Sequence, residues 1–371
     1  MSNNLPTATS AILPRHGGDL FRMAAQSGHL ATDLLDFSVN VCPDGPPDFL
    51  LQSMNKALKQ VAAYPSPHAD EALEAAASYH GIPEEHFVFG NGSNEVIHAL
   101  ARVLKKKQTP CVYIVEPAFS EYGLACSLAG LELCHVMSTL FLPDASTTLG
   151  DMVKTAPSGA AVFLANPGNP SGLYLAREVC LDLMAQRPDL LWIVDEAFID
   201  YVEQDRVVSL IGHMPENGLV LRSLTKFYAV PGLRVGYAVA SREMAQAIRQ
   251  EMPFWNLNCL AIAAAVAVFE DQSDFANQTR ATNAMRRTDL ATQLASLPEL
   301  ELLPSQANYI LFRYQNAPSD LYTRLLSQHG IAIRDCSNYY GLTDGTWFRV
   351  AVRFPAEHTR LVQALQTVMK Q

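Results

Sequence analysis

Short apolar runs alternate with longer segments of helical spacing along most of the chain. Each run is bounded by polar or turn residues, and the intervening segments are long enough to form a helix. Such runs are typical of strands buried on both faces, and helix-length connections allow neighbouring strands to be parallel. The pattern therefore predicts a largely parallel sheet covered by helices. The predicted strands are residues 111–115, 160–165, 190–194, 219–221 and 235–240.

Helices are predicted between and before these strands. Residues 56–79 contain Ala- and Leu-rich helical stretches, which the sequence YPSP at residues 64–67 interrupts. Residues 94–104 also have helical spacing, and Ser93 or Asn94 is expected to be the N-cap because both residue types favour that position. A further long Ala-rich helical stretch begins at residue 261.

The C-terminal part of the chain is predicted to form a second, smaller α+β unit. Its apolar runs are residues 309–312, 331–334 and 347–352. The first 45 residues are punctuated by Gly and Pro, and we expect an irregular arm that packs with the smaller unit and the active site. The expected division is an arm over 1–45, a large domain over 46–275 and a small domain over 276–371.

Composition and charge restrict the class of protein further. A chain of 371 residues with only 17% charged residues fits a compact globular enzyme. The net charge of -10 argues against a nucleic-acid surface. The seven cysteines lack C-x-x-C spacing, so we expect no disulfide framework and no metal site, and a cytoplasmic location. We see neither a signal-peptide pattern at the start nor an apolar stretch of membrane-spanning length.

The candidate chemistry begins with a lysine that follows a predicted strand. Lys226 ends the sequence Ser-Leu-Thr-Lys that starts at Ser223, and Arg234 lies eight residues after the lysine. A lone lysine at such a place is usually a solvated surface charge. Here hydroxyl groups and a guanidinium accompany it, and these groups can hold a phosphate monoester. An amine beside phosphate anchors suits pyridoxal 5′-phosphate (PLP), and burial among cations would lower the pKa of that amine.

Three further motifs fit the same cofactor, although each has a simpler structural explanation. Asp195 ends a predicted buried strand, where it is either a turn-forming residue or the partner of the cofactor's pyridinium nitrogen. Asn169 lies in a Pro- and Gly-rich turn after another strand, and its amide can serve the phenolic oxygen O3′ of the cofactor. Residues 90–95, Gly-Asn-Gly-Ser-Asn-Glu, precede a helix, and a helix N-terminus binds phosphate through free N–H groups.

In order and spacing, these four motifs resemble the class I and II aminotransferases, a family of fold-type I PLP enzymes, over nearly the whole chain. The resemblance implies an α/β fold with a large domain on a mostly parallel central sheet and a smaller α+β domain. It also implies that Lys226 holds PLP as a Schiff base, that Asp195 pairs with the pyridinium nitrogen and that Asn169 donates to O3′. The residues assigned to the PLP phosphate are Ser93, Asn94, Ser223 and Arg234.

Three aromatic positions refine the resemblance. Phe119 occupies the position of the aromatic residue that stacks on the cofactor ring, although an ordinary core aromatic is equally expected there. Tyr64 is similar to the tyrosine that reaches the phosphate of the neighbouring subunit, which implies a homodimer with shared active sites. Phe198 stands where many family members have a tyrosine. The O3′ hydrogen bond then depends on Asn169, and the pKa of the cofactor's imine should differ from that of an ordinary aminotransferase.

Two arginines near the C-terminus indicate a small substrate with two anionic groups. Arg349 matches the family's arginine for the substrate carboxylate, and Arg334 stands where histidinol-phosphate aminotransferases have an arginine for phosphate. The segments 16–18, 35–40, 222–228 and 334–339 resemble the threonine-phosphate decarboxylases of cobalamin biosynthesis. On this resemblance the substrate-binding residues are His16, Gly17, Asn40, Asn169, Arg334 and Arg349.

The expected reaction is PLP-dependent decarboxylation of O-phospho-L-threonine to (R)-1-aminopropan-2-yl phosphate for the nucleotide loop of cobalamin. Histidinol-phosphate aminotransferase is the alternative, because both reactions begin when the substrate amine displaces Lys226. They differ in which bond to Cα stands perpendicular to the cofactor ring, and residue types do not define that torsion angle. A non-catalytic ligand-sensing module of the same fold is disfavoured, because no helix-turn-helix segment precedes the fold and the catalytic set is complete.

Overall fold

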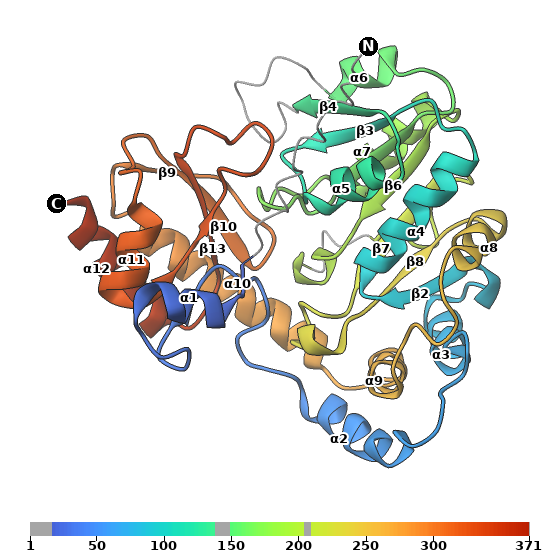
Figure 1. Cartoon of the computed structure of the whole chain (residues 1–371), viewed down its shortest axis with the longest axis horizontal. Coiled ribbons are helices and arrows are strands. Elements are labelled where there is room, and N and C mark those ends of the chain that lie inside the picture. Colours follow the sequence, from blue (N-terminus) through green and yellow to red (C-terminus); the bar gives the residue numbers. More distant parts are fainter. Residues whose placement is uncertain (1–16, 138–148, 204–208, 371) are drawn as a thin grey trace, which may run out of the picture.

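The computed structural model describes residues 17–137, 149–203 and 209–370, and its largest feature is a seven-stranded sheet (Figure 1). Strand β8 is antiparallel to both of its neighbours, and the other adjacent strands are parallel. The five predicted strands are confirmed, with ends displaced by at most two residues. In sheet order the strands are β2 (Phe87–Asn91), β8 (Val235–Val239), β7 (Gly218–Ser223), β6 (Leu191–Asp195), β5 (Ala161–Ala165), β3 (Val112–Glu116) and β4 (Leu133–Met137).

The two edge strands, β2 and β4, were missing from the sequence prediction. Strand β4 is only partly buried, so its apolar pattern is weak. Strand β2 ends with Gly90 and Asn91, which the sequence analysis assigned to a turn. Both residues pair with β8, so a partner from far along the chain makes them part of the sheet.

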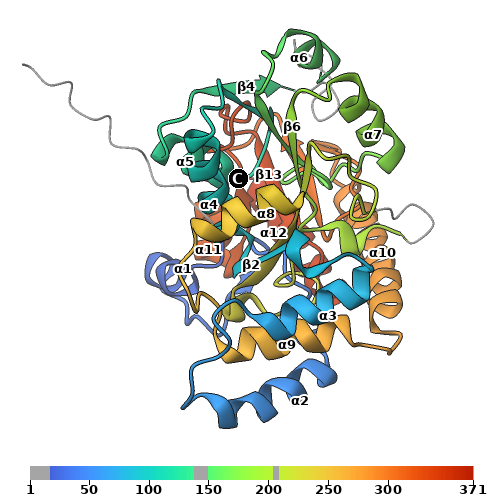
Figure 2. The same cartoon turned by 90° about the vertical axis from the view of Figure 1, so that its right-hand side faces the viewer.

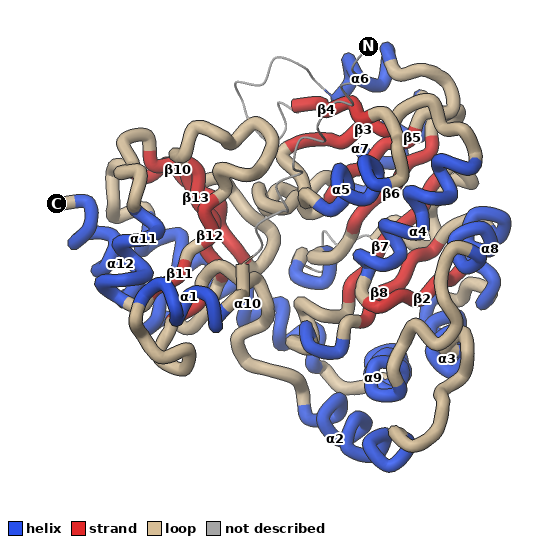
Figure 3. Tube along the Cα trace, in the orientation of Figure 1, coloured by secondary structure: helices blue, strands red, loops and turns tan. Residues whose placement is uncertain are grey.

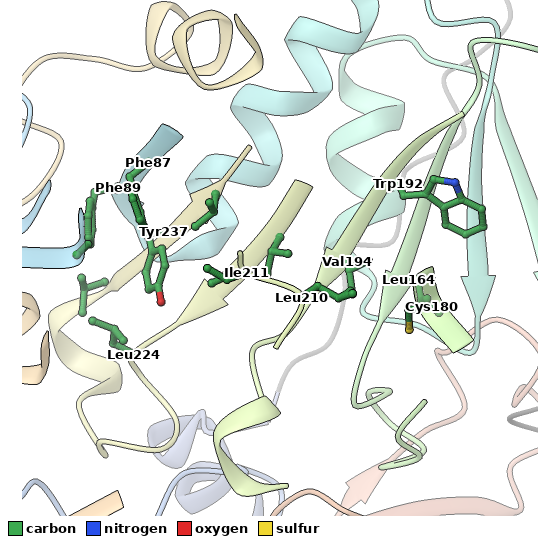
Figure 4. Packing of buried hydrophobic residues seen from close by; sticks show 14 of the residues in the cluster. Phe87, Phe89, Leu164, Cys180, Trp192, Val194, Leu210, Ile211, Leu224 and Tyr237 are labelled. Atoms are coloured by element: carbon green, nitrogen blue, oxygen red, sulfur yellow. The ribbon is translucent and has the colours of Figure 1, made fainter. Parts of the chain in front are cut away.

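Helices cover both faces of the sheet, as Figures 1 and 2 show. Alternate residues of a strand enter opposite cores: Trp192 and Val194 join one core, and Ile193 joins the other. Figure 4 shows part of the first core, with Phe89 and Tyr237 at one end and Trp192 at the other. The first core includes residues of α2 (Asp48–Ala57), α3 (Asp70–His80), α6 (Leu149–Thr155), α7 (Arg177–Gln186) and α9 (Cys259–Phe269), and the second includes residues of α4 (Ser93–Lys106), α5 (Glu121–Leu128) and α8 (Arg242–Gln250).

Helix α4 is the predicted helix of residues 94–104, but the expected N-cap is wrong. The N-cap is Gly92, and Ser93 is already the first helical residue. Gly92 has φ +79°, and a Cβ built there would lie 2.7 Å from Nη2 of Arg234. Glycine therefore fits this position because it tolerates the backbone conformation and leaves room for the guanidinium. The Glu95 amide donates to the Gly92 carbonyl at 3.2 Å. The amides of Ser93 and Asn94 come before the first α-helical hydrogen bond and are available for an anion.

A second, four-stranded antiparallel sheet lies beside the large one, as Figure 3 shows in red. The predicted strands 309–312 and 347–352 are confirmed, whereas the single strand predicted at 331–334 is wrong. It divides at Ile333 into β11 and β12, because Ile331 pairs with Leu35 and Arg334 pairs with Arg349 in a different sheet. The elements are β9 (Leu300–Leu302), β10 (Tyr309–Tyr314), β12 (Arg334–Asp335), β13 (Trp347–Ala351), α10 (Phe275–Leu294), α11 (Leu321–His329) and α12 (Pro355–Met369).

The described part of the N-terminal arm is more regular than predicted. It contains α1 (Leu20–Ser27), which is capped by Asp19, and β1 (Leu35–Asp36), which pairs in parallel with β11 (Ile331–Ala332). Leu35 and Phe37 are buried in the core of the smaller sheet. The predicted domain limits at 45/46 and 275/276 remain predictions.

Short 3-10 helices complete the architecture: η1 (Leu58–Gln60), η2 (Glu84–His86), η3 (Ile199–Tyr201) and η4 (Pro231–Leu233). Within the described ranges, every helix is too short or too polar to cross a membrane.

Candidate active site

Most of the residues singled out in the sequence meet in one cavity of about 570 Å³. The parallel strands β5 and β6 end at this cavity, which is where ligands bind in open α/β sheets. The chain after β7 and the first turn of α4 also line it, and loops next to the smaller sheet contribute from the other side. The predicted site residues in its lining are Gly17, Asn40, Ser93, Asn94, Phe119, Asn169, Asp195, Ser223, Lys226, Arg234, Arg334 and Arg349.

Lys226 brings a partly buried amine to the cavity. Its Nζ donates to Oγ1 of Thr225 at 3.1 Å, and its backbone carbonyl accepts from the Cys42 amide and the Tyr201 hydroxyl. Burial, followed by the charge of Arg234, lowers the pKa of Lys226 from 10.5 to about 8. A sizeable fraction of the amine is therefore neutral near neutral pH, and a neutral amine is the form that attacks a carbonyl.

Asp195, at the end of β6, is a buried carboxylate with two hydrogen bonds. Its Oδ2 accepts from the Tyr122 hydroxyl at 2.6 Å, and its Oδ1 accepts from the Ala197 amide at 3.0 Å. Burial raises the pKa of Asp195, while these two hydrogen bonds and the charge of Lys226 oppose that shift. A cation placed beside the carboxylate would offset its burial, as a protonated pyridine ring would do.

Tyr122 is a site residue that the sequence analysis missed. It lines the cavity and stacks on Phe163 at a centroid distance of 4.8 Å. The available signal was its place three residues after Phe119, in the first turn of α5. Phe119 itself lines the cavity and meets Tyr122 edge-on at 5.7 Å.

The first turn of α4 and Arg234 line the cavity together with groups that can hold an anion. Gly236 of β8 lies directly behind this turn, since a Cβ there would be 2.4 Å from the backbone nitrogen of Ser93. Asn94 Oδ1 is buried and has no hydrogen-bond partner among the described residues. Ser223 Oγ, hydrogen-bonded to Thr225 Oγ1 at 2.8 Å, adds a hydroxyl. Helix N–H groups, a guanidinium and hydroxyls together suit a phosphate.

Asn169 and Arg349 are joined across the two sheets. Nη1 of Arg349 donates to Oδ1 of Asn169 at 2.5 Å, and its Nη2 donates to the Ser38 carbonyl at 2.9 Å. Because a guanidinium only donates, this contact fixes which end of the Asn169 amide is oxygen and leaves Nδ2 as a donor. Asn40 also lines the cavity, and its Nδ2 is buried without a hydrogen-bond partner among the described residues.

Arg334 supplies a second guanidinium on the same side of the cavity. Its Nη2 donates to Asn338 Oδ1 at 2.8 Å, and its guanidinium lies 5.2 Å from the centre of the Tyr339 ring. Tyr339 lines the cavity too, and its hydroxyl lies 3.5 Å from Oδ1 of Asn169. Although Tyr339 is part of a motif noted in the sequence, its place in the site was not predicted.

The remaining residues named in the sequence analysis are Phe198, Tyr64 and His16. Phe198 lines the cavity and packs edge-on against Tyr309 at 5.1 Å. Tyr64 is outside the cavity of this chain, with 84% of its surface exposed, and it contacts Trp255. His16 lies outside the described residues.

The residues present fit PLP. The cavity combines a partly buried amine of lowered pKa, a buried carboxylate that a cation would stabilise, and a phosphate-type anion site. When bound, PLP supplies a protonated ring that accepts the electron pair of a bond broken at the substrate's Cα. Lys226, Asp195, Asn169 and the first turn of α4 with Arg234 are the groups that would hold it.

The comparison with known families agrees with this class of enzyme. Residues 32–365 match the family model "Aminotransferase class I and II", and the chain belongs to that family, whose enzymes depend on PLP.

The more specific similarity is to decarboxylases of phosphothreonine. The chain is 36% identical to a threonine-phosphate decarboxylase of Salmonella typhimurium, over 95% of this chain and 96% of that one. It is 30% identical to the adenosylcobalamin biosynthesis bifunctional protein CobDQ of Leptospira interrogans, covering 96% of this chain but 41% of that protein. A histidinol-phosphate aminotransferase of Halalkalibacterium halodurans is 29% identical, with coverages of 89% and 88%.

A solved structure agrees with the sequence comparison. The L-threonine-O-3-phosphate decarboxylase of Porphyromonas gingivalis superposes with a TM-score of 0.80 at 25% identity. The match covers 91% of this chain and 100% of that one.

Proposed function

We propose that this protein is a PLP-dependent decarboxylase of O-phospho-L-threonine, with (R)-1-aminopropan-2-yl phosphate as its product. The observation that carries the proposal is the presence of two guanidiniums, Arg334 and Arg349, in the same cavity as Lys226. They suit a small amino compound with two anionic groups. The similarity to a threonine-phosphate decarboxylase supports this substrate, and the similarity to a cobalamin biosynthesis protein supports the pathway.

The substrate is held at two separate points in this proposal. Arg334, with Tyr339 beside it, binds the phosphate, and Arg349 binds the carboxylate. Asn40 contributes a buried donor, and Gly17 lines the cavity where the arm packs on Ser38. His16, the remaining substrate-binding prediction, belongs to the same segment of the chain. Fixing both anions restricts rotation about the bonds to Cα, and such restriction selects which bond breaks.

Loss of CO2 leaves an electron pair at Cα, which must take up a proton. Lys226 is the group of the cavity best suited to deliver it, since its pKa of about 8 allows both protonation states near neutral pH. Tyr122 and the Ala197 amide hold the Asp195 carboxylate in place, where it would pair with the ring nitrogen of bound PLP. Asn169 Nδ2 would donate a hydrogen bond to O3′ of bound PLP, because Phe198 has no hydroxyl that could do so.

Product analysis tests the proposal. Purified protein with PLP and O-phospho-L-threonine is expected to release CO2 and the amine phosphate in equal amounts without any 2-oxo acid. Lys226→Ala should lack this activity and also the absorbance band of covalently bound PLP. A strict requirement for 2-oxoglutarate, or turnover of L-histidinol phosphate only, would contradict decarboxylation and favour an aminotransferase.

We further propose that the protein is a cytoplasmic homodimer with shared active sites. Tyr64, Phe254 and Trp255 form an exposed aromatic group whose exposed fractions are 84%, 64% and 48%. Large exposed aromatic surfaces favour protein interfaces. Tyr64 is then supplied to the phosphate site of the neighbouring subunit. All seven cysteines are unpaired, which supports a reducing compartment.

A further inference from the structure

Residues 336–342 form a loop in the first part of the connection from β12 to β13, and its residue Tyr339 lines the cavity. Arg334 at its start donates to Asn338, and Tyr339 packs against the Arg334 guanidinium. The loop is folded on itself by hydrogen bonds from the Tyr339 amide to the Cys336 carbonyl at 2.9 Å and from the Leu342 amide to the Tyr339 carbonyl at 3.1 Å. The direction of the Arg334 guanidinium thus depends on where this loop lies.

The other side of the loop rests on β4, the edge strand of the large sheet. The ring of Tyr340 stacks on the ring of His135, with a centroid distance of 4.4 Å and an angle of 11° between the planes. Next to it, Gly341 has φ +81°, and a Cβ there would lie 2.3 Å from Cε of Met137. The loop therefore contacts the large sheet closely through two successive residues, Tyr340 and Gly341.

His135 is itself held from beneath by a buried carboxylate. Its Nδ1 donates to Oε1 of Glu116 at 2.8 Å, and Glu116 is only 4% exposed. The other oxygen of Glu116 accepts from the Ala118 amide at 2.7 Å, directly before Phe119 in the cofactor site. A continuous set of contacts thus connects the segment that carries Phe119 with the loop beside Arg334.

We propose that His135 and Tyr340 are positioning residues for the substrate's phosphate. Their stacked rings, supported by Glu116, hold loop 336–342 against the large sheet so that Arg334 and Tyr339 keep their places in the cavity. Neither His135 nor Tyr340 lines the cavity, so they act through the loop and not by contact with the substrate. The inference rests on the proposed function, because it takes Arg334 as the phosphate-binding residue.

The test compares Tyr340→Ala with Tyr340→Phe, which keeps the stacked ring. Tyr340 is 51% exposed, so its truncation leaves the core intact. For Tyr340→Ala we expect KM for O-phospho-L-threonine to rise roughly three- to tenfold, which corresponds to the free energy of one aromatic pair. We expect kcat to stay within about twofold of wild type. Tyr340→Phe should match wild type. PLP affinity, measured by absorbance titration, should be the same in all variants.

His135→Ala should reproduce the effect, and the double variant His135→Ala/Tyr340→Ala should be no worse than either single variant, because both remove the same contact. An unchanged KM in Tyr340→Ala would overturn the proposal. So would equal damage in Tyr340→Phe, a parallel loss of PLP affinity, or additive effects in the double variant.

A second measurement separates this proposal from the substrate assignment. If wild type does not turn over O-phospho-L-threonine, the proposed function fails, and the loop contact is tested by amide hydrogen exchange. Faster exchange at Tyr339 and Leu342 in Tyr340→Ala than in Tyr340→Phe supports a loop held by the stacked ring. Equal exchange in the two variants overturns it.

Discussion

At the scale of single residues, the site depends on charges that burial has changed. Lys226 has its pKa lowered to about 8 by burial and by Arg234, whereas burial raises the pKa of Asp195. The amine is therefore easier to deprotonate than an exposed lysine, and the carboxylate gains most from a cationic partner. Both shifts favour binding of a cofactor that has an aldehyde and a basic ring nitrogen.

The lowered pKa of Lys226 predicts how the apoprotein takes up PLP. The neutral amine is the nucleophile, and its fraction increases as the pH rises through the pKa. The rate of covalent attachment, followed by absorbance after mixing, should therefore increase up to about pH 8 and then level off. An ordinary lysine of pKa 10.5 would accelerate well beyond that pH.

Arg234 provides the control for this measurement. In Arg234→Gln burial still lowers the pKa of Lys226 but the second cause, the charge of Arg234, is gone, so the levelling-off should move part of the way to higher pH, whereas Arg234→Lys should keep it near the wild-type value. A profile that is identical in Arg234→Gln and wild type would contradict the contribution of Arg234 to the lowered pKa.

At the scale of elements, the anion site depends on how α4 begins. Gly92 combines a left-handed backbone conformation with close approach of the Arg234 guanidinium, and Gly236 allows β8 to lie against the first helical turn. Two glycines thus bring a helix N-terminus and an arginine to the same point. Both positions are glycine because a side chain there would displace either the helix N-terminus or the Arg234 guanidinium.

Gly92→Ala should weaken PLP binding without unfolding the sheet. The new Cβ would lie 2.7 Å from Arg234 Nη2, so the guanidinium must move, and the backbone at φ +79° becomes strained. We expect the dissociation constant for PLP to rise by roughly tenfold or more, since a hydrogen bond to a charged group is worth about 1.5–3 kcal/mol. Gly212→Ala is a matched control, because Gly212 has φ +83° and open space around it. Equal PLP affinity in Gly92→Ala and Gly212→Ala would contradict this role of Gly92.

At the scale of the whole molecule, the proposed dimer can be tested by complementation. Lys226→Ala lacks the reactive amine, and Tyr64→Ala lacks the hydroxyl that we propose for the neighbouring subunit. In a hybrid dimer of the two variants, one site has both wild-type residues. Activity should therefore appear when the two proteins are mixed under conditions that allow subunit exchange.

Each variant alone, taken through the same exchange, provides the baseline for this experiment. Mass analysis shows whether hybrid dimers have formed. If they have, and the mixture is no more active than the summed activities of the two single variants, Tyr64 does not contribute to the active site of the neighbouring subunit. A chain that is monomeric at all concentrations would contradict the dimer itself.

The motifs of the sequence were enough to identify the PLP-dependent family and to name most of the candidate residues that the structure brings into one cavity. Asp195 ends a buried strand, and Lys226 and Asn169 each follow one. Parallel strands that end at one edge of a sheet bring such residues together. The apolar runs predicted five strands of the large sheet because residues buried on both faces leave a strong local pattern.

Features that depend on partners distant in the chain became visible only in the folded structure. Strand β2 exists through pairing with β8, and the run 331–334 divides between two partner strands. At the Gly92 N-cap, the approach of Arg234 leaves no room for a Cβ. Tyr122 joins the candidate site through its hydrogen bond to Asp195, and the role that we propose for His135 depends on its stacking with Tyr340. A local pattern records burial and backbone preference, whereas these contacts join side chains across the fold, and spacing along a single chain does not encode them.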